Sequence, residues 1–100
     1  MSRISARSLG LAPDDPFPYL AAILLLERRT ALARSEASVV VLDYLGFTTD
    51  EISEQLNIST ETVRTYWKRI YRKTNFHRRK ELRCWLETML RQAFGGAEAA

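Results

Sequence analysis

Apolar residues recur along most of this chain at intervals of three and four positions, which is the spacing of helices with one buried face. Near the N-terminus, four residues with this spacing predict a helix over residues 17–33. They are Leu20, Ile23, Leu24 and Leu26. Pro18 falls where a first helical turn tolerates proline. Residues 1–16 mix serine, arginine, glycine and proline, and are expected to be poorly ordered.

The next segment carries both strand and helix signals. Its three consecutive valines at 39–41 have strand propensity. The apolar positions Val39, Leu42 and Leu45 instead fit a helix, and Gly46 is suited to terminate it. The pattern therefore favours a helix that ends just before the glycine.

Two helices joined by a tight turn are predicted in the middle of the chain. In the first, which is about two turns long, Ile52 and Leu56 form a buried edge. Either Thr48 or Thr49 is expected to cap its start. The turn spans residues 57–59.

The second of these helices is predicted from about residue 60 to about residue 74. Val63, Trp67 and Ile70 share one side of it and are expected to face the core, while Ile58 plugs the turn. Two short helices packed through such positions are typical of a helix-turn-helix.

A last helix is predicted over about residues 79–93, and the glycines that follow it are expected to leave residues 95–100 as a frayed tail. Its apolar face includes Leu82, Trp85, Leu86 and Met89. Because the pattern favours a helix in every segment, the fold class is expected to be all-α with four or five helices.

Positive charge is concentrated in one quarter of the chain. The formal net charge of the whole is only +3. Residues 60–83 contain nine Lys or Arg and two Glu, a net charge of +7, whereas residues 1–59 come to −3. This polarity favours a surface that faces a polyanion, although a solvated basic surface has the same composition.

The outward side of the helix at 60–74 carries much of this charge. It presents Arg64, Thr65, Lys68, Arg69 and Arg72. Positions 64, 68 and 72 lie in one row, where like charges repel one another unless an anion neutralises them. A helix fits the major groove of DNA, in which arginine and lysine pair with guanine and threonine meets a base or a thymine methyl. The side chains placed to contact phosphates are Thr48, Thr49, Thr62, Tyr66, Arg69 and Lys73.

Other chemistry finds little support in the sequence. Cys84 is the only cysteine, so neither an internal disulfide nor a thiolate metal cluster can form, and its side chain is expected to be packed. His77 is the only histidine and lies beside two arginines, which favours a loop cation over a catalytic base. No catalytic, cofactor or metal site is therefore expected. The apolar run 19–26 is too short to span a bilayer, and the cysteine content fits a reducing cytoplasm.

The central and C-terminal parts of the sequence resemble a known family. The segment from Gly46 to Leu82 is similar to the LuxR-type (GerE-like) helix-turn-helix regulators and aligns with them without a gap. The shared landmarks are Gly46, Glu51-Ile52, Glu54, Leu56, Ile58-Ser59, Thr62-Val63, Ile70, Arg72-Lys73 and Glu81-Leu82. The resemblance extends over roughly residues 32–92. It implies a four-helix DNA-binding domain at 34–94 whose third helix enters the major groove, preceded here by the additional N-terminal helix at 17–33.

The resemblance also implies roles for single residues. The base-reading positions would be Arg64, Thr65 and Lys68. The backbone-contacting positions would be Thr48, Thr49, Thr62, Tyr66 and Lys73, to which charge and placement add Arg69, Arg72 and Arg78. The fourth helix of the family often forms a two-fold dimer interface on DNA, which implies a homodimer. The interface residues would be Leu82, Trp85, Leu86 and Met89.

Some positions depart from the family pattern. Trp67 stands where a small aliphatic core residue is usual and Thr74 where leucine is usual, which we interpret as compensating volumes. In the competing interpretation, Trp67 is partly exposed and touches DNA. Asn75 replaces a glycine at the helix exit, and Arg78 replaces the serine that usually caps the fourth helix, whose start is then expected to be frayed.

The expected function is that of a sequence-specific transcriptional regulator that binds duplex DNA as a homodimer. One alternative is an antagonist that sequesters another regulator, using the apolar N-terminal helix to contact a protein partner. A second alternative is a promoter-binding module like sigma region 4. Only about 30 residues precede the matched segment, so the chain is expected to be a stand-alone regulator or a fragment, and Met1 favours the first.

Overall fold

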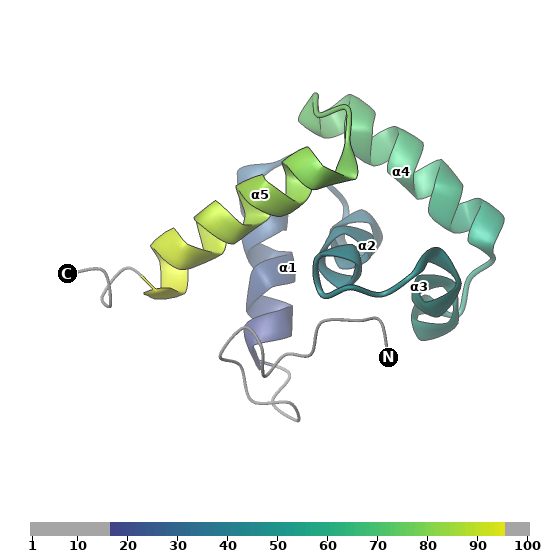
Figure 1. Ribbon diagram of the computed structural model, residues 1–100, viewed down its shortest axis with the longest axis horizontal. Coiled ribbons are helices and arrows are strands. Elements are labelled where there is room, and N and C mark those ends of the chain that lie inside the picture. The colour runs from purple at the N-terminus through teal and green to yellow at the C-terminus, as the bar shows by residue number, and fades with distance from the viewer. Residues whose placement is uncertain (1–16, 96–100) are drawn as a thin grey trace.

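The structure is a computed structural model that describes residues 17–95, and every regular element in this part of the chain is a helix (Figure 1). The predicted all-α fold class is therefore confirmed. The helices are α1 (Phe17–Arg29), α2 (Arg34–Tyr44), α3 (Thr49–Leu56), α4 (Thr60–Thr74) and α5 (Arg79–Leu90), with a π-helical turn at Arg91–Gly95. The segment 1–16 and nearly all of the predicted tail at 95–100 lie outside the described residues.

Helix α1 ends four residues earlier than the sequence predicted. The hydroxyl of Thr30 donates to the carbonyl of Leu26 at 2.6 Å and accepts from the backbone N–H of Leu32 at 3.1 Å. These two bonds satisfy backbone groups without a further helical turn. The chain is thereby released into a short connection before α2 begins at Arg34.

The buried face of α1 also differs from the prediction. Ile23 and Leu26 lie in the core, as expected, together with Ala22. Leu20 and Leu24 were assigned to the same face, and that assignment is wrong because these two residues are 51% and 49% exposed. The two leucines lie one helical turn apart on the outward side of α1.

Helix α2 is the centre of the fold (Figure 1). It packs against α1, α3, α4 and α5, so it is covered on every side. The valines at 39–41 and Leu42 are all buried in consequence, which explains why their pattern did not show a single apolar face. The same surroundings bury two carboxylates of this helix, those of Glu36 and Asp43.

Local capping defines where α3 and α4 begin and where α3 ends. Thr48, rather than Thr49, caps α3: its hydroxyl accepts from the N–H of Glu51 at 3.2 Å, while the Glu51 carboxylate accepts from the N–H of Thr48 at 2.9 Å. Asn57 ends α3 in the left-handed conformation, with φ of 56°. Ser59 then caps α4 by accepting from the N–H of Thr62 at 3.1 Å.

The start of α5 is capped without a serine. Arg78 offers no side-chain cap, but the carboxylate of Glu81 accepts from the N–H groups of His77 at 2.9 Å and Arg78 at 3.1 Å. The Glu81 carboxylate thus satisfies backbone N–H groups at the helix start in place of a capping serine, and α5 begins at Arg79. The exit of α4 just before it passes through Asn75, whose φ is 63°.

Trp67 belongs to the core. This residue is only 3% exposed, so the interpretation in which Trp67 is partly exposed and touches DNA is wrong. Its ring lies 5.5 Å from that of Tyr71, and the guanidinium of Arg79 lies 4.5 Å from its centroid on the outside.

Cys84, by contrast, is exposed on α5 rather than packed, because it lies on the opposite side of the helix from Leu82 and Leu86. Within residues 17–95, none of the helices combines the length and the apolar character needed to cross a membrane.

Candidate nucleic-acid interface

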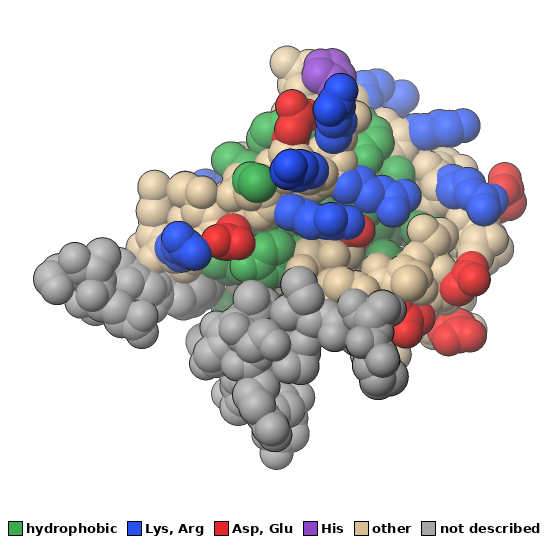
Figure 2. All heavy atoms as spheres, in the orientation of Figure 1, with side chains coloured by type: hydrophobic (Ala, Val, Ile, Leu, Met, Phe, Trp, Pro, Cys, Tyr) green, Lys and Arg blue, Asp and Glu red, His purple; other side chains and the backbone are tan. Residues whose placement is uncertain are grey.

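Within residues 17–95, exposed basic residues line the outward face of α4. Its inward face buries Val63, Trp67 and Ile70. All five residues that the sequence assigned to the opposite side are exposed. They are Arg64, Thr65, Lys68, Arg69 and Arg72. Figure 2 shows basic side chains gathered along α4 and across α5, whereas acidic ones cluster over α3.

The helix starts bring the predicted threonines to the ends of α3 and α4. Thr48 is exposed at the cap of α3, and Thr49 is half-buried at its first position. Thr62 lies in the first turn of α4, where its hydroxyl is 2.9 Å from the hydroxyl of Ser59. Helix starts present unpaired N–H groups and the positive end of the helix dipole, a suitable environment for phosphate.

Three other residues predicted to contact DNA differ in their surroundings. Arg78 is exposed in the loop between α4 and α5, next to the basic face. Tyr66 is half-buried and packs partly against the core, so its ring is anchored. On α4 itself, Arg64 forms an ion pair with the exposed Glu61 one turn before it. Exposed ion pairs of this kind contribute little to stability, so Arg64 can readily exchange Glu61 for another anion.

Lys73 has a different environment from the other predicted contacts. Its ammonium lies 2.8 Å from the carboxylate of Glu36 on α2, and its side chain is only 30% exposed. The same Glu36 oxygen accepts from the N–H of Ala33 at 2.9 Å, which caps the start of α2. Lys73 therefore connects the last turn of α4 to α2, and its positive charge is neutralised by a carboxylate of the same chain.

The charge state of Glu36 follows from this pairing. Burial on its own raises the pKa of the carboxyl group. The hydrogen bonds from Lys73 and Ala33, with the positive charges of Lys73 and Arg69, outweigh burial and hold the pKa below its usual value. A carboxylate with a lowered pKa in the folded state stabilises the fold above its unfolded pKa and loses that contribution as the pH falls.

Acidification is therefore expected to weaken the fold partly through Glu36. The free energy of unfolding, measured by urea titration at a series of values from about pH 7 down to about pH 3, is expected to fall more for the parent chain than for Glu36→Gln. The exposed Glu54→Gln serves as the matched control and is expected to follow the parent. A constant difference between the parent and Glu36→Gln across this range would contradict the assignment.

Two further basic residues act within the fold. Arg83 on α5 donates to both carboxylate oxygens of the buried Asp43, at 2.9 and 3.1 Å, and this pairing raises the pKa of Arg83. Arg79 stacks on Trp67. Sequence reasoning assigned Lys73 to a phosphate contact and counted Arg79 and Arg83 only as part of the basic segment. The signal that could have identified the partners of Lys73 and Arg83 is the pair of acidic residues inside the apolar helix α2, because buried carboxylates require a cation.

The residues predicted to form a dimer interface are mostly inside the domain. Leu82, Leu86 and Met89 are buried in its own core, out of reach of a second copy. Trp85 alone is half-buried, with its ring 5.8 Å from that of Phe76. The outward face of α5 carries polar and charged residues instead, including Lys80, Glu87 and Thr88.

The comparisons with known proteins agree with this geometry. Residues 30–86 match the family described as "Bacterial regulatory proteins, luxR family". The chain is similar to the "HTH-type transcriptional regulator MalT" of Vibrio campbellii, with 32% identity over 65 residues, which are 65% of this chain and 7% of the relative. It is also similar to the protein of that name from Vibrio cholerae, with 34% identity over 56 residues, which are 56% of this chain and 6% of the relative.

The matched region thus corresponds to a small part of these long relatives. No solved structure matches the chain. The family match covers more than half of the sequence, including α2, α3, α4 and most of α5, and it favours this family over the sigma-like alternative. Together with the helix-turn-helix geometry of α3 and α4, it confirms the resemblance: the chain belongs to the LuxR family of bacterial regulatory proteins.

Proposed function

We propose that this protein is a transcriptional regulator that binds duplex DNA sequence-specifically by inserting α4 into the major groove. The observation that carries the proposal is the division of α4 into a buried apolar side and an exposed side bearing Arg64, Thr65 and Lys68. Arginine and lysine on such a helix pair with guanine edges, and threonine meets a base or a thymine methyl. We assign the protein no catalytic role and place it in the cytoplasm, where bacterial DNA lies.

Phosphate contacts would fix the position of α4 in the groove. Exposed Arg69, Arg72 and Arg78 supply positive charge beside the base-reading residues, while Thr48 and Thr62 lie at helix starts. Lys73 is less suited to this role than the sequence suggested, because it is paired with Glu36. The proposal therefore gives the backbone contacts mainly to the three arginines and the threonines.

Selection from a random duplex library tests whether the protein reads sequence. Rounds of binding, recovery and sequencing are expected to enrich one short pattern that contains guanine. Repeating the selection with Arg64→Ala is expected to relax the preference at one or two base pairs while leaving the others. Recovery of random sequence after several rounds would overturn the sequence-specific part of the proposal.

We further propose that two copies pair on DNA. The outward face of α5 is polar, with Lys80, Glu87 and Thr88 exposed, so the pairing is expected to be too weak to persist without DNA. Light scattering after size-exclusion chromatography is expected to give a monomer for the free protein and a 2:1 complex with a palindromic duplex. A 1:1 complex on that duplex would contradict the pairing.

A protein partner remains a second candidate because of α1. Leu20 and Leu24 are the two large apolar residues exposed within the described chain, and they lie on the side of α1 that no other described helix covers. An antagonist would use such a surface to hold another regulator. Retention of DNA binding by Leu20→Ser/Leu24→Ser would separate this surface from the DNA-binding face.

A further inference from the structure

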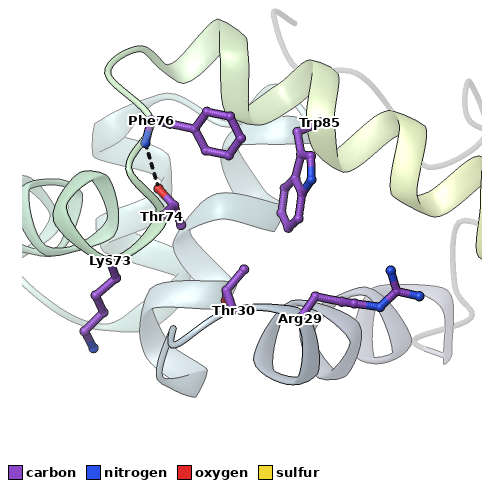
Figure 3. A pocket seen from close by; sticks show the side chains of 6 residues that line it. All are labelled: Arg29, Thr30, Lys73, Thr74, Phe76 and Trp85. Carbon is purple, nitrogen blue, oxygen red and sulfur yellow. Dashed lines mark hydrogen bonds between the residues drawn. The ribbon is translucent and has the colours of Figure 1, made fainter.

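A pocket of about 230 Å³ lies where the end of α1, the end of α4 and the middle of α5 come together (Figure 3). Helices α1 and α5 both pack on α2 but scarcely on each other, which leaves the space between them open. The lining residues are Arg29, Thr30, Lys73, Thr74, Phe76 and Trp85. None of them belongs to the outward face of α4 that the proposed DNA contact uses.

Two aromatic rings form one wall of this pocket. The rings of Phe76 and Trp85 lie 5.8 Å apart with a 50° angle between their planes. In Figure 3 the ring of Phe76 points toward Trp85, and the indole of Trp85 points toward the end of α1. Such a wall suits a flat aromatic ring, which gains both apolar burial and ring–ring contact.

The room in the pocket comes from Thr74. This is the position at which the family resemblance led us to expect leucine, with Trp67 making up the volume. The hydroxyl of Thr74 donates to the carbonyl of Ile70 at 2.7 Å and accepts from the N–H of Phe76 at 3.4 Å, so its hydrogen-bonding needs are met within the chain. Trp67 fills the core elsewhere, and the space beside Thr74 stays open to a ligand.

The charges at the pocket are positive. Arg29 is exposed and forms no ion pair with another described residue. Lys73 is paired with Glu36, which does not line the pocket, and in Figure 3 its ammonium points away from the two rings. No carboxylate is among the lining residues. The pocket therefore combines an aromatic wall with an arginine at its edge, whose exposed side chain extends along α1 away from the rings in Figure 3 and would turn toward a ligand.

We propose that this pocket binds a small aromatic carboxylate, a single ring bearing one acidic group. The ring would lie against Phe76 and Trp85, and the carboxylate would pair with Arg29, a geometry to which a guanidinium is suited. The size agrees, because a cavity of about 150 Å³ accommodates benzene, and the larger space here admits one substituent. The inference does not rest on DNA binding.

The test uses the whole chain without DNA and follows backbone amide signals by NMR during titration with benzoate. The expected result is saturable shifts that centre on Thr30, Thr74, Phe76 and Trp85. Benzamide, which has the same ring but no charge, is expected to bind at least about fivefold more weakly. Shifts that are scattered over the basic face, absent altogether, or equal for the two probes would overturn the proposal.

Two variants sharpen the test. Thr74→Leu fills the space with an apolar side chain and is expected to abolish benzoate binding while the chain still unfolds cooperatively. Arg29→Gln is expected to weaken binding about fivefold, whereas Arg28→Gln, its exposed neighbour outside the pocket, is the matched control and is expected to bind like the parent. Undiminished binding by Thr74→Leu, or equal loss in the two arginine variants, would refute the site.

Discussion

Replacing Arg64 and Lys68 together with alanine is expected to weaken binding to a selected duplex by at least about thirtyfold. Both side chains are exposed on the outward row of α4, and each is proposed to pair with a base edge. Since a good pair of this kind contributes about 1–3 kcal/mol, the loss of two amounts to a factor well above experimental error. Fluorescence anisotropy at one fixed salt concentration measures it.

The matched control for this pair removes the same charge from elsewhere. Arg28→Ala/Arg34→Ala takes two exposed arginines from α1 and from the start of α2, away from the outward faces of α4 and α5. This variant is expected to lose only a few-fold in affinity, through the general electrostatic effect. Equal losses in the two double variants would mean that net charge, rather than the row on α4, governs binding.

The second large effect is expected at Lys73. Lys73→Met is expected to lower the free energy of unfolding by about 3 kcal/mol, because it leaves the carboxylate of Glu36 buried without its cation. The estimate lies at the low end of the range for broken buried pairs, since the Lys73 side chain keeps some contact with water. Urea titration of the purified variant measures the change.

A double-mutant cycle identifies the cause. Adding Glu36→Gln to Lys73→Met removes the buried charge but keeps an oxygen that accepts from the N–H of Ala33. The double variant is therefore expected to recover about 2 kcal/mol relative to Lys73→Met. Lys80→Met, at an exposed lysine, is the control and is expected to change stability by less than about 0.5 kcal/mol. A Lys73→Met variant as stable as this control would contradict the structural role.

Local signals predicted the central part of the fold well. Threonine and serine at helix starts, and asparagine at helix ends, act within a few residues of the backbone groups that they satisfy, so a single sequence reveals them. Thr48, Ser59 and Asn75 are such positions. The buried side of α4 was also predictable, because its apolar residues are sparse and strictly spaced.

Helix α1 could not be oriented from its sequence. Between Tyr19 and Leu26 every residue is apolar or aromatic, so any face of the helix satisfies the periodicity. Which leucines are buried depends on how α1 lies on α2, a tertiary property. Leu20 and Leu24 were misplaced for this reason.

The long-range pairs escaped prediction for a related reason. Glu36 and Lys73 are 37 positions apart, and Asp43 and Arg83 are 40 apart. Charge counting assigns such cations to the surface, while only the packing of α2 at the centre reveals that their partners are buried. The apolar side of α5 likewise suited either a core or a dimer, and Leu82, Leu86 and Met89 lie in the core.

The central claim is that α4 and its flanking arginines bind duplex DNA. The most direct test measures the affinity for a selected duplex and for random duplex across a salt series. The proposed contacts from Arg69, Arg72 and Arg78 of two copies predict that log affinity falls against log salt with a slope of about −5, and that the selected duplex binds at least about a thousandfold more tightly. Absence of binding at low salt, or binding that is insensitive to salt, would contradict the account.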